Sequence, residues 1–145
     1  MSSAPTIPLL RPEQRWFTPD EANALLPELL DDIESLIDAI ATVRELGEMI
    51  EETDDPAERA MLATDISELQ AQARQALMVL NGHGVDVKGL EPALLDFPAQ
   101  RYGQQVCLCW REGEEAIAWW HPLHTGVAGR EPIASTPAEA WEYWS

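Results

Sequence analysis

Apolar residues recur at intervals of three and four through most of the first half of the chain. This spacing is the heptad pattern of a helix that buries one face against a neighbouring helix. The first series comprises Leu26, Leu29, Ile33, Leu36, Ile40, Val43 and Ile50, with Gly47 at one apolar position and Leu25, Leu30 and Ile37 widening the stripe. The second comprises Leu62, Ile66, Leu69, Ala73, Ala76 and Leu80. The pattern predicts two amphipathic helices, the first with a face wide enough for more than one neighbour.

Residues typical of helix starts precede both series. Thr18, Pro19 and Glu21 predict a capping box before the first. In such a box the Thr hydroxyl accepts a backbone N–H of the first turn, and the Glu side chain accepts the N–H of the Thr. The corresponding residues before the second series are Asp55, Pro56 and Glu58.

The two predicted helices should lie antiparallel. Asn81 and Gly82 end the second helix, because either residue can adopt the left-handed backbone conformation that satisfies the last helical carbonyls. Pro27 lies inside the first pattern, so we expect a kink or a new helix start near it. The connector between the series is short, which predicts a hairpin over residues 17–81 with arms of about 40–50 Å.

After residue 82 the pattern changes to short apolar runs separated by glycine and proline. Alternation and turn residues predict three strands, at 94–99, 104–110 and 116–121, with turns at 100–103 and 111–115. A three-stranded sheet needs a cover, and the wide stripe of the hairpin is the candidate. The expected fold class is therefore α+β, with a long antiparallel, coiled-coil-like helical hairpin packed against a small antiparallel three-stranded β-meander. Residues 1–145 form one domain, with the strand region at 82–133.

The face on which His121 lies depends on the turn before it. Alternation places Leu108 and Trp110 on one face of the second strand and Cys107 and Cys109 on the other. A turn of two or four residues would place His121 on the face of Leu108, whereas a three-residue turn with a bulge would place it on the cysteine face. The sequence leaves both arrangements open. Two cysteines on alternate positions of one strand suit a disulfide poorly, so we expect buried free thiols.

Residues 134–145 are predicted as either a loose tail or a short helix. Thr136, directly before Pro137, can cap such a helix. The helix would dock Trp141 and Trp144 against the rest of the molecule, and termini fray unless such contacts hold them.

The chain is strongly acidic, with 26 Asp and Glu against 9 Lys and Arg and a formal net charge of -17 over 145 residues. Nucleic acid and anionic membranes are not expected as partners, because affinity for phosphate comes from basic residues. No apolar run reaches the roughly 20 residues of a membrane span. The first 16 residues lack the basic start and apolar centre of a signal peptide, so we expect a cytoplasmic protein.

Candidate metal ligands gather between residues 109 and 132. His121 and His124, with Glu114 across the hairpin turn, could bind a divalent ion such as iron or zinc, because two imidazoles and one carboxylate leave positions open for water or substrate. Further carboxylates expected nearby are Asp96, Glu21 and Asp86. The alternative is that both histidines are rim residues bonded to the backbone. Thiolate ligation by Cys107 and Cys109 is less favoured, because the pair lacks the usual C-x₂-C spacing.

The same segment contains a candidate anion or substrate site. Gly129 would let backbone N–H groups approach a ligand, and Arg130 could grip a carboxylate or phosphate through two parallel bonds, with Lys88 as a further cation. The alternative is structural, with Arg130 paired to an internal carboxylate. The candidate partners are Glu114, Asp96 and Asp86.

Two stretches of the chain are distinctive. They read "FTPDEANALLP" in residues 17–27 and "VDVKGLEPALLDFPAQRYGQQVCLCWREGEEAIAWWHPLHTGVAGREPI" in residues 85–133, with an LCW strand, a GE turn, a WH pair and a GxxGR loop. On these motifs the chain resembles the bacterial domain of unknown function called DUF2203, over roughly residues 16–133. The resemblance implies a small soluble protein with helices first and a compact strand region after them, and it carries no activity. The chain departs from the family pattern at His124, where the family has an acidic residue; both types can bind a metal.

Two functions fit the sequence. The hairpin is long for so small a protein, which favours a protein-interaction or dimerisation module whose seam meets a second copy or a protein partner. The alternative is a metal-binding protein or metal-dependent enzyme, with the two histidines as ligands and Arg130 orienting a substrate.

Overall fold

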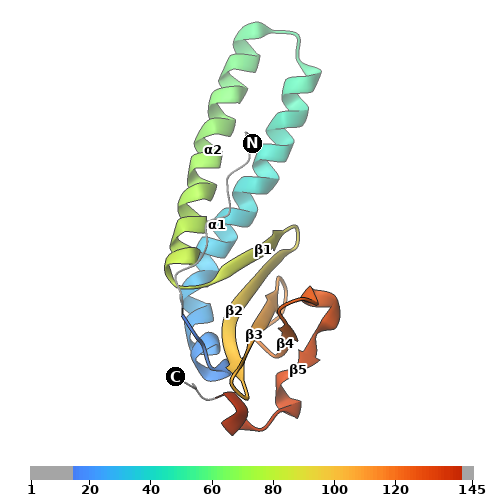
Figure 1. The fold of residues 1–145 in the computed structure, drawn as a ribbon. Coiled ribbons are helices and arrows are strands. Elements are labelled where there is room, and N and C mark those ends of the chain that lie inside the picture. The colour runs from blue at the N-terminus through green and yellow to red at the C-terminus, as the bar shows by residue number, and fades with distance from the viewer. Residues whose placement is uncertain (1–14, 142–145) are drawn as a thin grey trace, which may run out of the picture.

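The computed structural model describes residues 15–141, which form two long helices, a five-stranded sheet and three short 3-10 helices (Figure 1). The helices are α1 (Pro19–Glu52) and α2 (Pro56–Gly82), and the strands are β1 (Asp86–Leu90), β2 (Ala93–Arg101), β3 (Gln104–Arg111), β4 (Trp119–Pro122) and β5 (Glu131–Pro132). The 3-10 helices are η1 (Gly126–Gly129), η2 (Ile133–Ser135) and η3 (Ala138–Trp141). The α+β class and the packed helical hairpin are confirmed.

The start of α1 forms the predicted capping box. The backbone N–H of Glu21 donates to the Thr18 hydroxyl at 3.2 Å, and the N–H of Thr18 donates to the Glu21 carboxylate at 2.9 Å. The helix then continues through Pro27, so no new start occurs there.

Both ends of α2 differ in detail from the sequence prediction. Asp55 caps the helix by accepting the N–H of Ala57, but its own N–H donates to the hydroxyl of Thr53 rather than to Glu58. At the other end the left-handed residue is Gly84, with φ of 87°, and not Asn81 or Gly82. The helix itself ends at Gly82, so only the left-handed residue lies two positions later than predicted.

The sheet contains five antiparallel strands in the order β1-β2-β3-β4-β5, so the prediction of three strands is wrong. Strands β2, β3 and β4 correspond to the predicted meander. Strand β1 was missed because Lys88 and Gly89 interrupt its alternation, where its pairing with β2 also shifts register. Strand β5 has only two residues and its pairing with β4 is visible only in three dimensions.

The helical hairpin covers one face of this sheet and extends well beyond it (Figure 1). The shared core joins the first half of α1, the second half of α2 and the apolar face of the strands. Its largest fully buried side chains include Phe17, Leu29, Leu36, Leu80, Leu95, Phe97 and Leu108. In the part of the hairpin remote from the sheet, the two helices pack on each other and contact no other described element of residues 15–141. Leu30, expected to widen the buried stripe, is instead exposed.

The register of β3 and β4 answers the question about His121. This residue lies directly opposite Cys107, and therefore on the cysteine face. The connection is longer than any turn considered, because β3 continues to Arg111 and β4 begins only at Trp119. The predicted third strand thus starts three residues too early.

As far as Trp141, the C-terminal segment contains the short helix of one predicted alternative, as the 3-10 helix η3. Trp141 of η3 is buried and packs edge-to-face on Trp120, with ring centroids 6.2 Å apart. The carbonyl of Ala140 accepts the N–H of Tyr102, which fixes η3 to the β2–β3 turn. Trp144 lies outside the described residues. Neither long helix is apolar enough along its length to cross a membrane, a statement that covers residues 15–141 only.

Candidate functional site

A compact group of ionisable side chains lies on the sheet face opposite the helices. Asp96 of β2, Cys107 of β3 and His121 of β4 each present one ligand atom, and these three atoms lie within 4.8 Å of one another. Strand register explains the grouping. On one side of β3, His121 of β4 lies opposite Cys107. On the other side of β3, Asp96 of β2 lies opposite Cys109, which is two residues along from Cys107 and on the same face. All three side chains are buried. Within residues 15–141 this is the one group of three such residues close enough to share a metal ion.

The imidazole of His121 is held at both nitrogens. Nδ1 lies 2.7 Å from the carbonyl oxygen of Pro122, and Nε2 lies 3.0 Å from Oδ1 of Asp96. A carbonyl oxygen can only accept, so Nδ1 carries a hydrogen and donates. Nε2 is therefore the ring nitrogen that faces Asp96, and its lone pair is the one available to a cation held between Asp96 and Cys107.

Burial dominates the electrostatics of this group. Loss of hydration raises the pKa of the Asp96 carboxyl, while its hydrogen bond to His121 acts in the opposite direction. Burial and then the nearby Asp96 charge raise the pKa of the Cys107 thiol to about 12. The same two causes raise the pKa of Cys109 to about 11. Both cysteines are therefore neutral thiols at neutral pH, which agrees with the expectation of buried free thiols.

These properties favour metal ligation over nucleophilic catalysis. A nucleophilic cysteine needs a lowered pKa, which a basic neighbour or a helix N-terminus normally supplies. Cys107 has the reverse, because a carboxylate lies beside it and water is excluded. By contrast, thiolate, imidazole and carboxylate form a donor set typical of zinc, and a bound cation would remove the unfavourable charge of the deprotonated groups.

Two of the three ligands predicted from sequence lie elsewhere. Glu114 Oε2 accepts from Arg130 Nη2 at 2.5 Å, and its Oε1 accepts the N–H of Arg111 at 2.7 Å. His124 is exposed and lines a separate pocket at the end of the sheet. Neither belongs to the group that includes His121.

Arg130 adopts the structural alternative. It pairs with Glu114 and places its guanidinium carbon 4.9 Å from the ring centroid of Trp119. Gly129 serves close packing, because a Cβ at this position would lie 2.4 Å from both Cβ and Oγ1 of Thr125. The loop thus holds the arginine in place.

The remaining predicted residues are divided between the sheet and the helix. Lys88 forms an ion pair with Asp86 at 2.7 Å, and the hydrogen bond to Asp86 raises the pKa of the lysine. Asp86 lies opposite Asp96 in the β1–β2 register and so stands next to the buried group. Glu21 belongs to the capping box of α1. Asp96, expected only as a supporting carboxylate, is a member of the group itself.

The sequence disfavours Cys107 as a metal ligand only because Cys107 and Cys109 lack the C-x₂-C spacing of local cysteine pairs. The relevant partners are not its sequence neighbours, since Asp96 and His121 come from two other strands. Once β3 is paired on both sides, alternation along each strand brings these residues to one face. The sequence feature that could have identified this group is therefore the placement of its three residues on one face of neighbouring strands. The spacing between ligands along the chain does not identify it.

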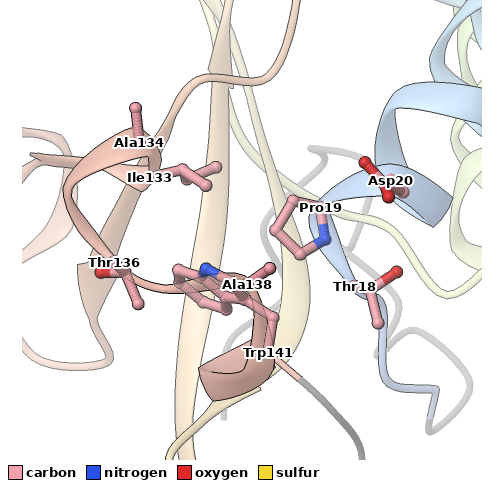
Figure 2. Close-up of a pocket in the computed structure, with 8 residues that line it drawn as sticks. All are labelled: Thr18, Pro19, Asp20, Ile133, Ala134, Thr136, Ala138 and Trp141. Atoms are coloured by element: carbon pink, nitrogen blue, oxygen red, sulfur yellow. The ribbon is translucent and has the colours of Figure 1, made fainter.

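A second hollow lies where the two ends of the described chain meet (Figure 2). Thr18, Pro19 and Asp20 line one side, and residues between Ile133 and Trp141, including the Trp141 ring, line the other (Figure 2). Its volume is about 330 Å³. Among residues 15–141 the indole N–H of Trp141 finds no hydrogen-bond partner.

The fold and the buried group together define an α+β protein with a helical hairpin and a mixed Asp–Cys–His cluster on its sheet. The chain belongs to the DUF2203 family, described as an uncharacterized conserved protein, whose family model matches residues 15–133. Comparison with curated proteins and with solved structures found no match.

Proposed function

We propose that this protein binds a transition-metal ion, with zinc as the best fit, through Asp96, Cys107 and His121. The observation that carries the proposal is the convergence of three chemically different ligand atoms within 4.8 Å. Carboxylate, thiolate and imidazole are the donor types that zinc prefers, and thiolate disfavours magnesium and calcium.

The hydrogen bond from His121 to Pro122 supports the same proposal. Histidines that bind metals commonly donate their second ring N–H to a carbonyl or carboxylate, which fixes the tautomer and the orientation of the ring. The 2.7 Å contact between Nδ1 and the Pro122 carbonyl has this form, and it directs Nε2 toward the other two donors.

Three protein ligands leave a tetrahedral ion one further position. A bound ion would supply Lewis acidity or structural cross-linking of β2, β3 and β4. The low exposure of all three side chains favours the structural role, because a substrate would need a path to the ion. We further propose a cytoplasmic location, where a reducing environment would keep Cys107 available as a thiol.

Metal content of untagged protein, combined with zinc titration against a competing chelator, tests the proposal. Cys107→Ser keeps a hydroxyl that can still donate to Asp96, and Asp96→Asn keeps the shape of the side chain. Each should weaken zinc binding by more than the roughly 10–100-fold that loss of a supporting contact costs. Cys109→Ser is the matched control, because it removes the other buried thiol of the same strand face.

In the cobalt-substituted protein, thiolate-to-metal charge-transfer absorption should be present in the wild type and in Cys109→Ser, and absent in Cys107→Ser. Equal zinc affinity in the two serine variants, or no stoichiometric zinc binding by folded wild-type protein, would contradict the proposal.

A second candidate function is supported by the part of the hairpin at residues 40–69, the distal hairpin. Its seam is incompletely covered: Leu62 is buried, whereas Ile50, Ile66 and Leu69 remain half-exposed and Met61 is 70% exposed. The segment carries nine acidic residues against two arginines. We infer a docking surface, either for a second copy or for a protein partner. Charge favours a partner that presents a basic amphipathic helix, because two copies would bring like charges together.

The mass of the protein in solution and titration with a basic amphipathic peptide test this second function. Leu69→Glu should abolish dimerisation or peptide binding, while Gln70→Glu, an exposed neighbour with the same added charge, should preserve it. A monomer that binds no such peptide would exclude the docking role.

A further inference from the structure

The end of the sheet contains a pocket that is separate from the buried metal group. It lies where the β2–β3 hairpin meets the segment after β4, and its volume is about 420 Å³. The polar side chains that line it are Arg101, Gln104, Gln105, Trp120 and His124, and the apolar ones are Val106, Pro122 and Leu123. The pocket includes His124, which the sequence predicts as a metal ligand, but its other lining residues are not metal ligands.

Every polar side chain of this lining can donate a hydrogen bond, and none is a carboxylate. That composition contrasts with the chain as a whole, which has 26 acidic residues. Arg101 provides the charge. Among residues 15–141 it forms no ion pair with a carboxylate, unlike Arg130, which is paired with Glu114. A cation at the wall of a pocket of donors is the arrangement that recognises an oxyanion.

The arginine is held in a fixed position before any ligand arrives. Its Nε donates to the hydroxyl of Thr136 at 3.1 Å, and its guanidinium carbon lies 4.3 Å from the ring centroid of Trp120. With Nε used and the plane stacked, the terminal nitrogens are the donors left for a ligand. Such preorganisation lowers the entropy lost on binding.

Trp120 forms part of the wall against which Arg101 lies. The residue is only 5% exposed, and within residues 15–141 its indole N–H has no hydrogen-bond partner. Because Trp120 lines the pocket, its indole N–H resonance reports on a ligand that binds there.

We propose that this pocket binds the oxyanion group, carboxylate or phosphate, of a small molecule whose apolar part lies against Leu123 and Val106. Arg101 binds the charge, and Gln104 and His124 add further hydrogen-bond donors at the rim. The site is independent of the metal proposal, because none of the three metal ligands lines it.

The experiment titrates the full-length protein with phenyl phosphate, benzoate and inorganic phosphate, and follows the indole N–H resonance of Trp120 by NMR. Saturable binding of phenyl phosphate or benzoate, with a dissociation constant of about 1 mM or tighter, is expected. The more strongly bound of the two identifies the oxyanion, and weaker binding of inorganic phosphate identifies the contribution of the apolar part.

Gln104→Glu places a carboxylate in the pocket at an exposed strand position and should weaken binding by about tenfold or more through repulsion and competition for Arg101. Gln70→Glu adds the same charge on α2 and should leave binding unchanged. Arg101→Gln should also weaken binding by about tenfold or more, with Arg74→Gln as its matched control.

Absence of saturable binding by all three probes would overturn the proposal. So would equal weakening by Gln104→Glu and Gln70→Glu, because that result would assign the effect to net charge. If Arg101→Gln fails to fold, the comparison of Gln104→Glu with Gln70→Glu decides the outcome alone.

Discussion

Asn23 joins the first helix to the connection between β3 and β4 through two hydrogen bonds, and it makes a third within the helix. Its Oδ1 accepts the backbone N–H of Ile117 at 2.8 Å, and its Nδ2 donates to the carbonyls of Ile117 and Pro19, both at 3.0 Å. The amide side chain thus pairs with both polar backbone groups of a residue 94 positions away. Ile117 is buried and lies in the connection between β3 and β4, so water is a poor substitute.

Asn23→Ala should destabilise the protein by about 2.5–4.5 kcal/mol. Two lost long-range hydrogen bonds account for about 2 kcal/mol, and the unpaired Ile117 backbone adds about 1–3 kcal/mol. The better helix propensity of alanine returns roughly 0.5 kcal/mol. For a protein of this length the change corresponds to a fall in Tm of about 7–14 °C.

Chemical denaturation followed by tryptophan fluorescence measures the free energy of unfolding, and hydrogen exchange measures protection of the Ile117 amide. Asn23→Asp distinguishes donation from acceptance, because a carboxylate can accept the Ile117 N–H but cannot donate to the two carbonyls. It should be at least as destabilising as Asn23→Ala. Glu28→Ala, at an exposed site of the same helix, is the control. A loss below about 0.5 kcal/mol with unchanged protection of Ile117 would refute the reasoning.

Three further predictions follow from the site and its supporting loop. Zinc affinity should rise about tenfold per pH unit between pH 6 and 8 from loss of the Cys107 proton alone, because a thiol with a pKa of about 12 must lose a full proton on binding. A zinc affinity that does not change with pH in a competition assay would exclude the thiolate as a ligand. The same pKa predicts that Cys107 and Cys109 of the metal-free native protein are alkylated at pH 8 far more slowly than after unfolding, as mass spectrometry can measure. Gly129→Ala should lower the free energy of unfolding by about 1–3 kcal/mol through its clash with Thr125. Thermal denaturation should show that Thr125→Gly, combined with Gly129→Ala, recovers part of that loss. No recovery would show that the clash does not involve Thr125.

The helical half of the fold could be predicted because its determinants are close together in the sequence. Thr18 and Glu21 are three residues apart and form the capping box as expected. The heptad spacing predicted the hairpin correctly, because helix faces repeat every three or four residues whatever lies opposite. The prediction failed at Gly84, where the turn depended on how the chain enters β1.

The candidate site could be predicted only in part. His121 was identified, and Asp96 was expected in a supporting position. His124 and Glu114 were grouped with His121 because they are near it in sequence, but strand pairing separates them. Glu114 instead neutralises Arg130, the pairing that was stated as the alternative.

The sequence by itself determined the two helices, the capped start of the first, the acidic composition and the presence of a strand region, because these depend on residue types, propensities and spacings within a few residues. Only the tertiary structure decided that His121 shares a face with Cys107 and Asp96, and that Asn23 binds Ile117. The physical reason is that strand register is cooperative. One residue of slippage in the pairing of β3 with β4 would move His121 to the opposite face. The connection between these strands is bound to α1 through Asn23 and Ile117, a contact that no local pattern encodes.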